Sequence, residues 1–221
     1  MTKKQKIKYK KQIKNAGYAL FTLILLTWFV FFGYQNGVQG ISGSGKDLLN
    51  DYEGIYSMDW KFNIGGSCLK AYDVGDGVIT VGFGNTYPSE EIAIDDINNK
   101  TKSHYKVGDC IKRKDLEKIQ DIDLRKRSKE INSLDQSYDT NLTANQFDAV
   151  LLLYYLNEAT IKDKSFWTMI SNENVDKQEY IDYFVGKFSN FELWSIYKKG
   201  WVLRIKDSAE LFFDGDYNRN H

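Results

Sequence analysis

The longest apolar run of the chain lies close to its start. Residues 16–34 (AGYALFTLILLTWFVFFGY) are 19 residues without a charge, and residues 1–14 contain seven lysines and no acid. A helix of this length just crosses a hydrocarbon core of about 30 Å. The pattern predicts a basic cytoplasmic segment (1–15), a transmembrane signal-anchor helix (16–34) and a remainder on the outer side of the membrane. A cleaved signal peptide has the same charge order, so that alternative stays open.

Residues 35–45 (QNGVQGISGSG) are rich in glycine and serine and predict a flexible linker. The pattern becomes that of a globular domain over residues 46–221. Its first segment, KDLLNDYEGIY, spaces its apolar residues as a helix does, and Gly54 is expected to end that helix.

From Lys112 onward the periodicity is mostly helical. The stretch KRKDLEKIQDIDLRKRSKEINSL is amphipathic, and SFWTMISN, KQEYIDYFVGKF and LRIKDSAELFF follow later. Between them, TANQFDAVLLLYYLNEA begins at Thr143, a good N-cap residue, and is apolar nearly all round. This pattern predicts a buried central helix.

Residues 68–84 alternate in polarity and are rich in β-branched and aromatic side chains. They predict a hairpin with strand CLKAYD, turn VGDG and strand VITVGFG. The expected fold class is therefore α+β, with a small hairpin lobe and a larger helical lobe, and clefts form between such lobes.

Composition narrows the function classes. Without the seven N-terminal lysines, residues 15–221 carry 23 basic against 30 acidic side chains, so nothing favours a nucleic-acid partner. Two cysteines and two histidines are too few for a common metal site, and we expect neither a metal nor a cofactor. Cys68 and Cys110 form either one disulfide or two free thiols.

The candidate chemistry gathers around Glu53 and the hairpin, which carries Asp73, Asp76 and Thr80. A glutamate shielded from water can act as a general acid, while an aspartate in a wetter place stays ionised. Hydrolysis of a sugar acetal needs such a pair, and a threonine hydroxyl can hold the attacking water. Aspartate and glycine also occur in hairpin turns for structural reasons alone.

The order of these motifs resembles the phage-type lysozyme family, glycoside hydrolase family 24. It is carried by Glu53-Gly54, Lys70-Ala71-Tyr72, the Asp73–Gly77 turn and the T-x-G-x-G-x-T motif at Thr80–Thr86. LTANQFDAVLLLYYLN resembles the central helix of the family, and GWVLRIKDSAELFFDGDY resembles its closing helix. The resemblance covers about residues 46–217.

The resemblance implies a lysozyme-like fold and a muramidase that cleaves the β-1,4 bond between N-acetylmuramic acid and N-acetylglucosamine in peptidoglycan. Glu53, Asp73 and Thr80 would be catalytic, with Asp76 as the alternative to Asp73. The residues expected to bind substrate are Tyr72, Gln146 and Arg204. We expect a membrane-anchored monomer whose partners are the membrane and the peptidoglycan glycan strands, either a phage-type endolysin or a local wall-remodelling enzyme.

Three departures from the family pattern concern the candidate site. Glu53 stands 27 residues before Thr80, with residues 55–66 as an apparent insertion. Val74 occupies the usual position of the aspartate, and we favour Asp73 on the expectation that a bulge re-aims it. Asn85 stands where the family commonly has histidine. These departures motivate an alternative function, a catalytically impaired peptidoglycan-binding or scaffolding protein.

Overall fold

The computed structural model divides the chain into two units, residues 1–38 and 39–221. The residues that it describes are 39–53, 68–73, 77–172, 174–191 and 194–219. The predicted membrane helix (16–34), the insertion (55–66) and Asp76 lie outside them. Within the described ranges, no helix is both long and apolar enough to span a bilayer.

The helices and strands are given in chain order. They are α2 (Gly43–Tyr52), β1 (Cys68–Leu69), β2 (Tyr72–Asp73), β3 (Ile79–Val81), β4 (Asn85–Tyr87), α4 (Glu90–Thr101), β5 (Ile111–Lys112), α5 (Arg113–Tyr138), α6 (Ala144–Leu156), α7 (Glu158–Lys162), α8 (Lys164–Ile170), α9 (Lys177–Phe188) and α10 (Trp194–Asp214).

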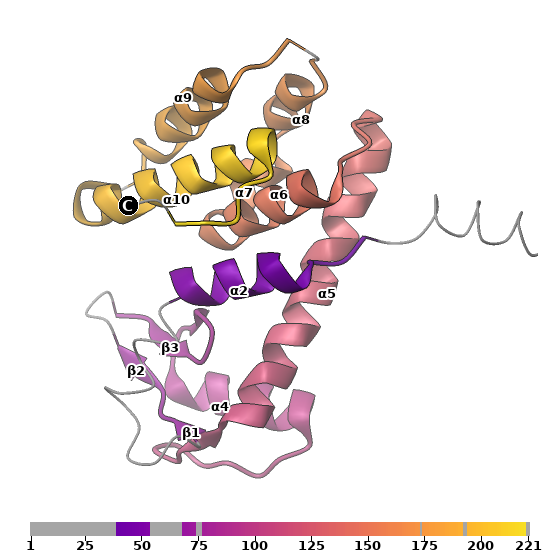
Figure 1. The fold of residues 1–221 in the computed structure, drawn as a ribbon. Coiled ribbons are helices and arrows are strands. Elements are labelled where there is room, and N and C mark those ends of the chain that lie inside the picture. The colour runs from indigo at the N-terminus through magenta and orange to yellow at the C-terminus, as the bar shows by residue number, and fades with distance from the viewer. Residues whose placement is uncertain (1–38, 54–67, 74–76, 173, 192–193, 220–221) are drawn as a thin grey trace, which may run out of the picture. The chain divides into compact units, whose positions relative to one another are not determined.

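The strands and α4 form the smaller lobe, drawn at the bottom of Figure 1. β2, β3 and β4 make an antiparallel sheet in that order, and β1 pairs with β5 in a second, two-stranded sheet. Ile94 and Ile97 of α4 share an apolar core with Val81 of β3. The hairpin between β2 and β3 was predicted, whereas β4, β5 and α4 were not. The mixed α+β class is confirmed.

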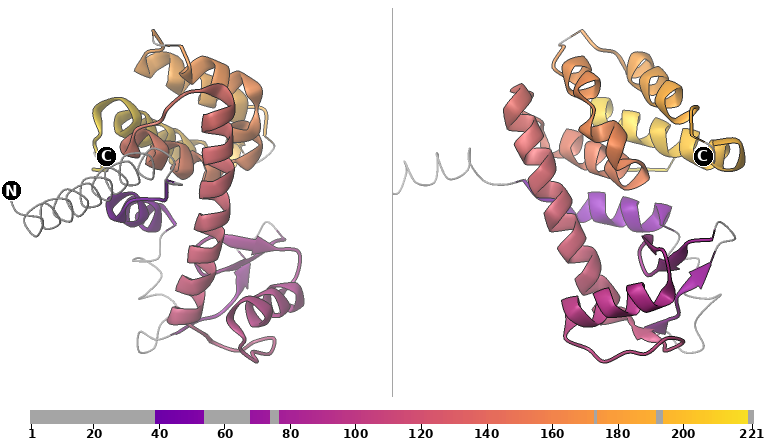
Figure 2. Two further views of the ribbon diagram at one scale, coloured as in Figure 1. Left: turned by 90° about the vertical axis from the view of Figure 1, so that its right-hand side faces the viewer. Right: turned by 180° about the vertical axis from the view of Figure 1, so that it is seen from behind.

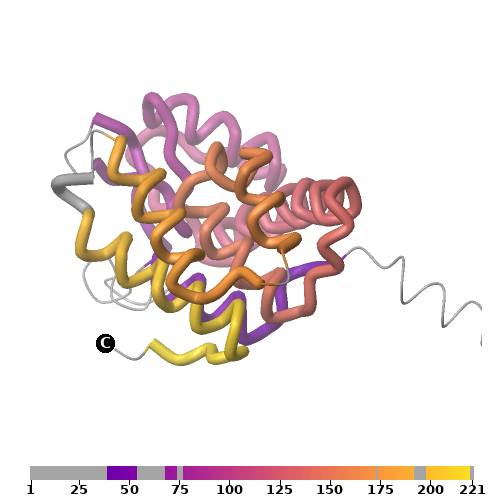
Figure 3. The backbone as a smooth tube through the Cα atoms, turned by 90° about the horizontal axis from the view of Figure 1, so that it is seen from above, coloured from indigo at the N-terminus to yellow at the C-terminus, as the bar shows by residue number. Residues whose placement is uncertain are grey.

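The remaining helices form the larger lobe around α6. Residues 147–154 of α6 are buried without interruption, because α2, α5, α7 and α10 all pack against this helix. The prediction of a buried central helix is therefore confirmed. α10 runs beside α9 (Figure 3). The long helix α5 extends from the strand lobe into the helical lobe, which Figure 2 shows from two sides.

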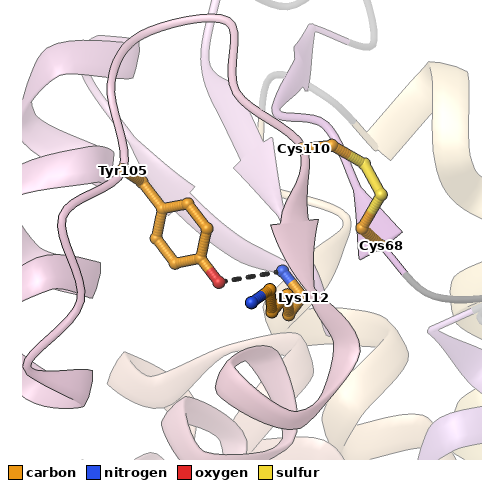
Figure 4. Close-up of a disulfide and its surroundings, with 4 residues drawn as sticks. All are labelled: Cys68, Tyr105, Cys110 and Lys112. Atoms are coloured by element: carbon orange, nitrogen blue, oxygen red, sulfur yellow. Dashed lines mark hydrogen bonds between the residues drawn. A yellow bond between two sulfur atoms is a disulfide. The ribbon is translucent and has the colours of Figure 1, made fainter.

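The two cysteines form a disulfide, which resolves the alternative that the sequence left open. Cys68 at the start of β1 is bonded to Cys110 just before β5, with their Cα atoms 5.4 Å apart (Figure 4). Beside it, the Tyr105 hydroxyl accepts a hydrogen bond from the Lys112 backbone N–H at 3.1 Å. The same hydroxyl donates to Asp115 at 2.6 Å. The bridge and this tyrosine together tie the edge of the strand lobe to the start of α5.

The structure differs from the predicted linker over residues 35–45, because α2 already begins at Gly43. Ser42 caps the helix by accepting from the Gly45 backbone N–H at 3.0 Å. The buried carboxylate of Asp148 in α6 accepts from the Ser42 backbone N–H at 3.0 Å and from the Tyr217 hydroxyl at 2.9 Å. A carboxylate at a helix N-terminus is favourable, and this one fixes the first turn of α2 against α6.

Gly45 lies so close to Asp148 that a Cβ atom there would be 2.5 Å from the carboxylate. We expect Gly45→Ala to lower the free energy of unfolding by about 1–3 kcal/mol, because the hydrogen-bonded carboxylate cannot move away freely. Gly43→Ala is the matched control, since a Cβ there meets nothing within 4 Å. Urea denaturation of both variants measures the difference, and equal stabilities would contradict the prediction.

The disulfide closes a separation of 42 residues, for which chain entropy predicts a stabilisation of about 4 kcal/mol. We expect the paired substitution Cys68→Ser and Cys110→Ser to lower the free energy of unfolding by up to this amount. Chemical denaturation with and without a reductant tests it. The reductant should lower the midpoint of the wild-type protein and leave that of the double variant unchanged. A wild-type midpoint that ignores the reductant would show that the bridge adds no stability.

Candidate active site

Glu53 is the C-cap residue of α2, and its side chain is 16% exposed. The Arg204 Nη2 atom in α10 donates to the Glu53 Oε1 atom at 2.9 Å, and the arginine side chain is 9% exposed. The glutamate side chain is therefore largely shielded from water. Arg204 was expected to bind substrate, and in the structure it donates a hydrogen bond to Glu53.

The T-x-G-x-G motif brings the backbone of the strand lobe close to this glutamate. Gly84 has a φ of +81°, and a Cβ atom there would lie 2.3 Å from the Glu53 Oε2 atom. Gly82 has a φ of +57°, and a Cβ there would lie 3.0 Å from Leu116 in α5. Both positions therefore require glycine for its backbone conformation and for the space it leaves. The two glycines thus let the turn between β3 and β4 pack directly against the Glu53 carboxyl group.

The sheet places Thr80 in a row of three side chains on one of its faces. Thr80 pairs directly with Tyr72 on one side and with Thr86 on the other, so the three side chains share one face. Burial and then the negative charge of Glu53 raise the pKa of Tyr72 to about 12. Thr80 is buried within the row. Two predicted residues, Tyr72 and Thr80, are thus neighbours on the same face of the sheet.

Asp73 lies elsewhere on the hairpin. It is exposed and pairs with Ile79, which packs into the core of the strand lobe. Successive strand residues point to opposite faces, so Asp73 falls on the face opposite Thr80. The bulge that was expected to re-aim Asp73 is absent from the pairs Tyr72–Thr80 and Asp73–Ile79, which are in simple register. Asp76 lies outside the described residues.

Gln146, the third residue of α6, is placed in a capping box. Its side-chain carbonyl accepts from the Thr143 backbone N–H at 2.9 Å. Tyr155 and Leu156, which line a pocket with Glu53, are at the other end of the helix, about 14 Å away at 1.5 Å per residue. The structure therefore does not bring Gln146 to the glutamate.

The pocket beside Glu53 has a volume of about 620 Å³. This falls within the range of roughly 300–1,000 Å³ that is usual for small-molecule sites. Its walls come from four elements besides Glu53: the end of the β3–β4 turn with β4, the helix α4, the helix α5, and the last turn of α6. The lining residues after Glu53 are Gly84, Asn85, Thr86, Tyr87, Ile92, Asp96, Lys100, Arg127, Tyr155 and Leu156.

Most of the charged groups around this pocket are paired with one another. Lys100 is 2.9 Å from Asp96 and 3.3 Å from Asp123 of α5. The Tyr87 hydroxyl donates to Asp96 at 2.7 Å, and this bond together with burial raises the pKa of the tyrosine. Sequence reasoning missed these side chains, because α4 was not predicted and nothing in the spacing showed that α4 and α5 face the same pocket. In the described part of the chain, no group of three or more His, Cys, Asp or Glu side chains could hold a metal ion.

Behind Glu53, the preceding residue Tyr52 carries a second network. Its ring lies under two guanidinium groups, with the Cζ atoms of Arg204 and Arg219 at 5.2 Å and 4.5 Å from the ring centroid. Arg219 also forms an ion pair with Asp51 at 2.7 Å. The Tyr52 hydroxyl donates to the carboxylate of Asp207, which is 1% exposed. The two residues that precede Glu53 are thus held by α10 and by the C-terminal segment.

The sequence model of the Phage lysozyme family matches residues 59–176, which is more than half of the chain. The chain belongs to the phage lysozyme family. This family membership indicates a glycoside hydrolase of the muramidase type that acts on peptidoglycan. No curated protein and no solved structure matches the chain.

The matched stretch contains the hairpin, the pocket walls and the central helix, but it begins after Glu53 and ends before Arg204. The place of these two residues in a phage lysozyme site therefore rests on geometry, namely their ion pair and the close approach of Gly84. The sequence signal for Glu53 was its position before glycine and upstream of the hairpin.

Burial raises the pKa of Asp207 to about 7 from the ordinary value of 3.8, and the neighbouring Glu210 adds to the effect. Between these two values the folded protein binds a proton that the unfolded chain has released. We therefore expect the free energy of unfolding to fall as the pH rises through this window, by at most about 1.4 kcal/mol per pH unit.

Asp207→Asn should remove this slope, and thermal or urea denaturation between pH 4 and pH 7 measures it. Asp95→Asn, at an exposed position of α4, is the control and should keep the slope. An Asp207→Asn protein with the wild-type slope would show that another group is responsible.

Proposed function

We propose that this protein is a membrane-anchored muramidase that hydrolyses the β-1,4 bond between N-acetylmuramic acid and N-acetylglucosamine in peptidoglycan. The observation that carries the proposal is a glutamate, held by Arg204, on the wall of a sugar-sized pocket in a chain of the phage lysozyme family. As a phage-type endolysin or as a local wall-remodelling enzyme, it would act on the same bond.

In this mechanism Glu53 is the general acid that protonates the leaving glycosidic oxygen. Arg204 holds the Oε1 atom, and the Oε2 atom is directed toward the Gly84 backbone at the pocket wall. This arrangement fixes the rotamer of the acid before substrate arrives, which favours a well-oriented proton transfer. The glycine at position 84 lets the turn approach the acid without a side chain between them.

The attacking water would be held by Thr80 and activated by a carboxylate of the hairpin, Asp73 or Asp76. What supports this role for Thr80 is its pairing with Tyr72, whose pKa is raised in part by the charge of Glu53. Attack from the face opposite the leaving group would invert the anomeric carbon if the two carboxyl groups stand roughly 6.5–9.5 Å apart. The register of β2 with β3 turns Asp73 away from Thr80, so both aspartates are retained as candidates for the base.

The apolar run over residues 16–34 and the lysines before it support an anchor that leaves residues 39–221 on the wall side of the membrane. The disulfide between Cys68 and Cys110 supports the same location, since such bonds persist outside the reducing cytosol. Confinement near the membrane would raise the effective concentration of the enzyme at the wall.

A second candidate function is a peptidoglycan-binding or scaffolding protein with impaired turnover. The observation that favours it is the hairpin, where Val74 occupies the usual place of the aspartate and Asp73 falls on the face opposite Thr80. Binding and hydrolysis of the same substrate by the same preparation distinguish the two functions.

The test uses the full-length protein in detergent with purified peptidoglycan. We expect wild-type protein to release reducing ends that mass spectrometry identifies as N-acetylmuramic acid. Glu53→Gln should lower the rate by about 10²–10⁴-fold, because glutamine can still accept the Arg204 hydrogen bond but carries no proton to donate. Asp73→Asn and Asp76→Asn are measured side by side. The aspartate whose replacement causes the larger loss of rate is the base.

The control Asp95→Asn, at an exposed position of α4, should keep the wild-type rate. Wild-type protein that binds peptidoglycan but releases no reducing ends would favour the scaffolding function. Anhydro sugars in place of hydrated products would indicate that the protein catalyses a transglycosylase reaction instead of hydrolysis.

A further inference from the structure

Arg127 of α5 lies in the same pocket as Glu53, and its position is fixed by the last turn of α6. The Cζ atom of its guanidinium is 4.0 Å from the centroid of the Tyr155 ring and 5.1 Å from that of Tyr154. Its Nη1 atom donates to the Tyr154 backbone carbonyl at 3.2 Å. Stacking and one hydrogen bond therefore hold the guanidinium in place before a ligand binds.

The charge of Arg127 has no carboxylate partner in the described ranges of the chain. Asp123, one helical turn earlier on α5, would be a natural partner at this spacing, but it pairs with Lys100 instead. Asp96 pairs with the same lysine, and Glu53 pairs with Arg204. Arg127 differs in this respect from Lys100, the other cation that lines the pocket, and a partly buried cation without a counterion favours an anionic ligand.

Tyr155 adds a second group that lacks a partner. Its hydroxyl is buried and makes no hydrogen bond to any residue that the structure describes. Burial raises its pKa, and Arg127, Asp123, Glu53 and Arg204 lie near enough to act on it as well. The phenol thus stays a neutral donor in the pocket that Glu53 and Arg127 also line. Buried donors without partners are rare and are often satisfied by a ligand or water.

We propose that Arg127, stacked on Tyr155, binds a carboxylate carried by the muramyl residue of peptidoglycan, and so makes this pocket selective for muramyl-containing strands. The inference rests on the proposed function and names the part of the substrate that the pocket recognises. Glycan backbones of N-acetylated sugars are neutral, and peptidoglycan differs from them in its carboxylates. These belong to the lactyl group where the stem peptide is absent, and to the stem peptide where it is present. The planar guanidinium matches a carboxylate through two parallel N–H donors.

The experiment measures kcat and KM of full-length wild-type and Arg127→Met protein on four substrates. These are intact peptidoglycan, glycan strands stripped of stem peptides by an amidase, and the same two materials after their carboxylates are converted to neutral amides. We expect Arg127→Met to raise KM about 10- to 100-fold on a carboxylate-bearing substrate, the loss typical of a hydrogen bond to a charged group. On the amidated substrates the variant and the wild-type protein should be equal.

The substrate arms identify the source of the carboxylate. An effect on stripped strands assigns it to the lactyl group, and an effect only on intact peptidoglycan assigns it to the stem peptide. Arg125→Met is the matched control, because Arg125 is an exposed arginine of the same helix that does not line the pocket, and it should change none of the values. Arg127→Lys keeps the charge but loses the paired donors, and we expect it to restore only part of the affinity.

An equal loss on charged and amidated substrates would overturn the inference and leave Arg127 a structural role. If the protein hydrolyses none of the substrates, the proposed function fails, but the contact of Arg127 with a carboxylate can still be tested. In that case, calorimetric binding of stripped strands and of soluble strands that keep their stem peptides, by wild-type and Arg127→Met protein, tests the carboxylate contact without turnover. Equal affinities of the two proteins for both materials would then overturn it. Thermal denaturation checks that both arginine variants are folded.

Discussion

The structure depends on the fixing of one short helix, α2, at both of its ends. At its start, the buried carboxylate of Asp148 accepts from the Ser42 backbone and holds the first turn against α6. At its end, Arg204 of α10 holds the carboxyl group of Glu53. A helix fixed at both ends cannot slide or rotate, so the position of the acid is set by the core of the helical lobe rather than by the loop that follows it.

The strand lobe contacts Glu53 through the backbone of a glycine, Gly84, rather than through a side chain. The close approach of Gly84 to Glu53 and that of Gly82 to Leu116 show why the T-x-G-x-G motif has its two glycines. The pairing of Tyr72 with Thr80 then places these two predicted polar residues on one face of the sheet. The pocket is completed by the far end of the same central helix that anchors α2, so one helix serves both the placement of the acid and the shape of the cleft.

Local patterns predicted much of the fold. The α+β class, the hairpin and the buried helix all follow from periodicity and capping, which are properties of neighbouring residues. Glu53, Tyr72 and Thr80 were singled out from their motifs, and the structure pairs Tyr72 with Thr80 and sets Gly84 of the same motif against Glu53. The face of Asp73 depends on strand register, and the capping role of Gln146 depends on its exact helix position, so neither followed from the motif. Arg127 was missed because its environment is made by α6 and α4, far away in sequence.

The ion pair of Glu53 and Arg204 joins residues 151 positions apart. During synthesis the acid therefore leaves the ribosome long before its partner, and it stays without that partner until α10 has been made and has packed against α6. Contacts of such long range form late and slowly in folding, because much of the chain must already be ordered. An unfinished chain thus has the glutamate but not its fixed geometry, and competence for catalysis would arise only at the last stage of folding.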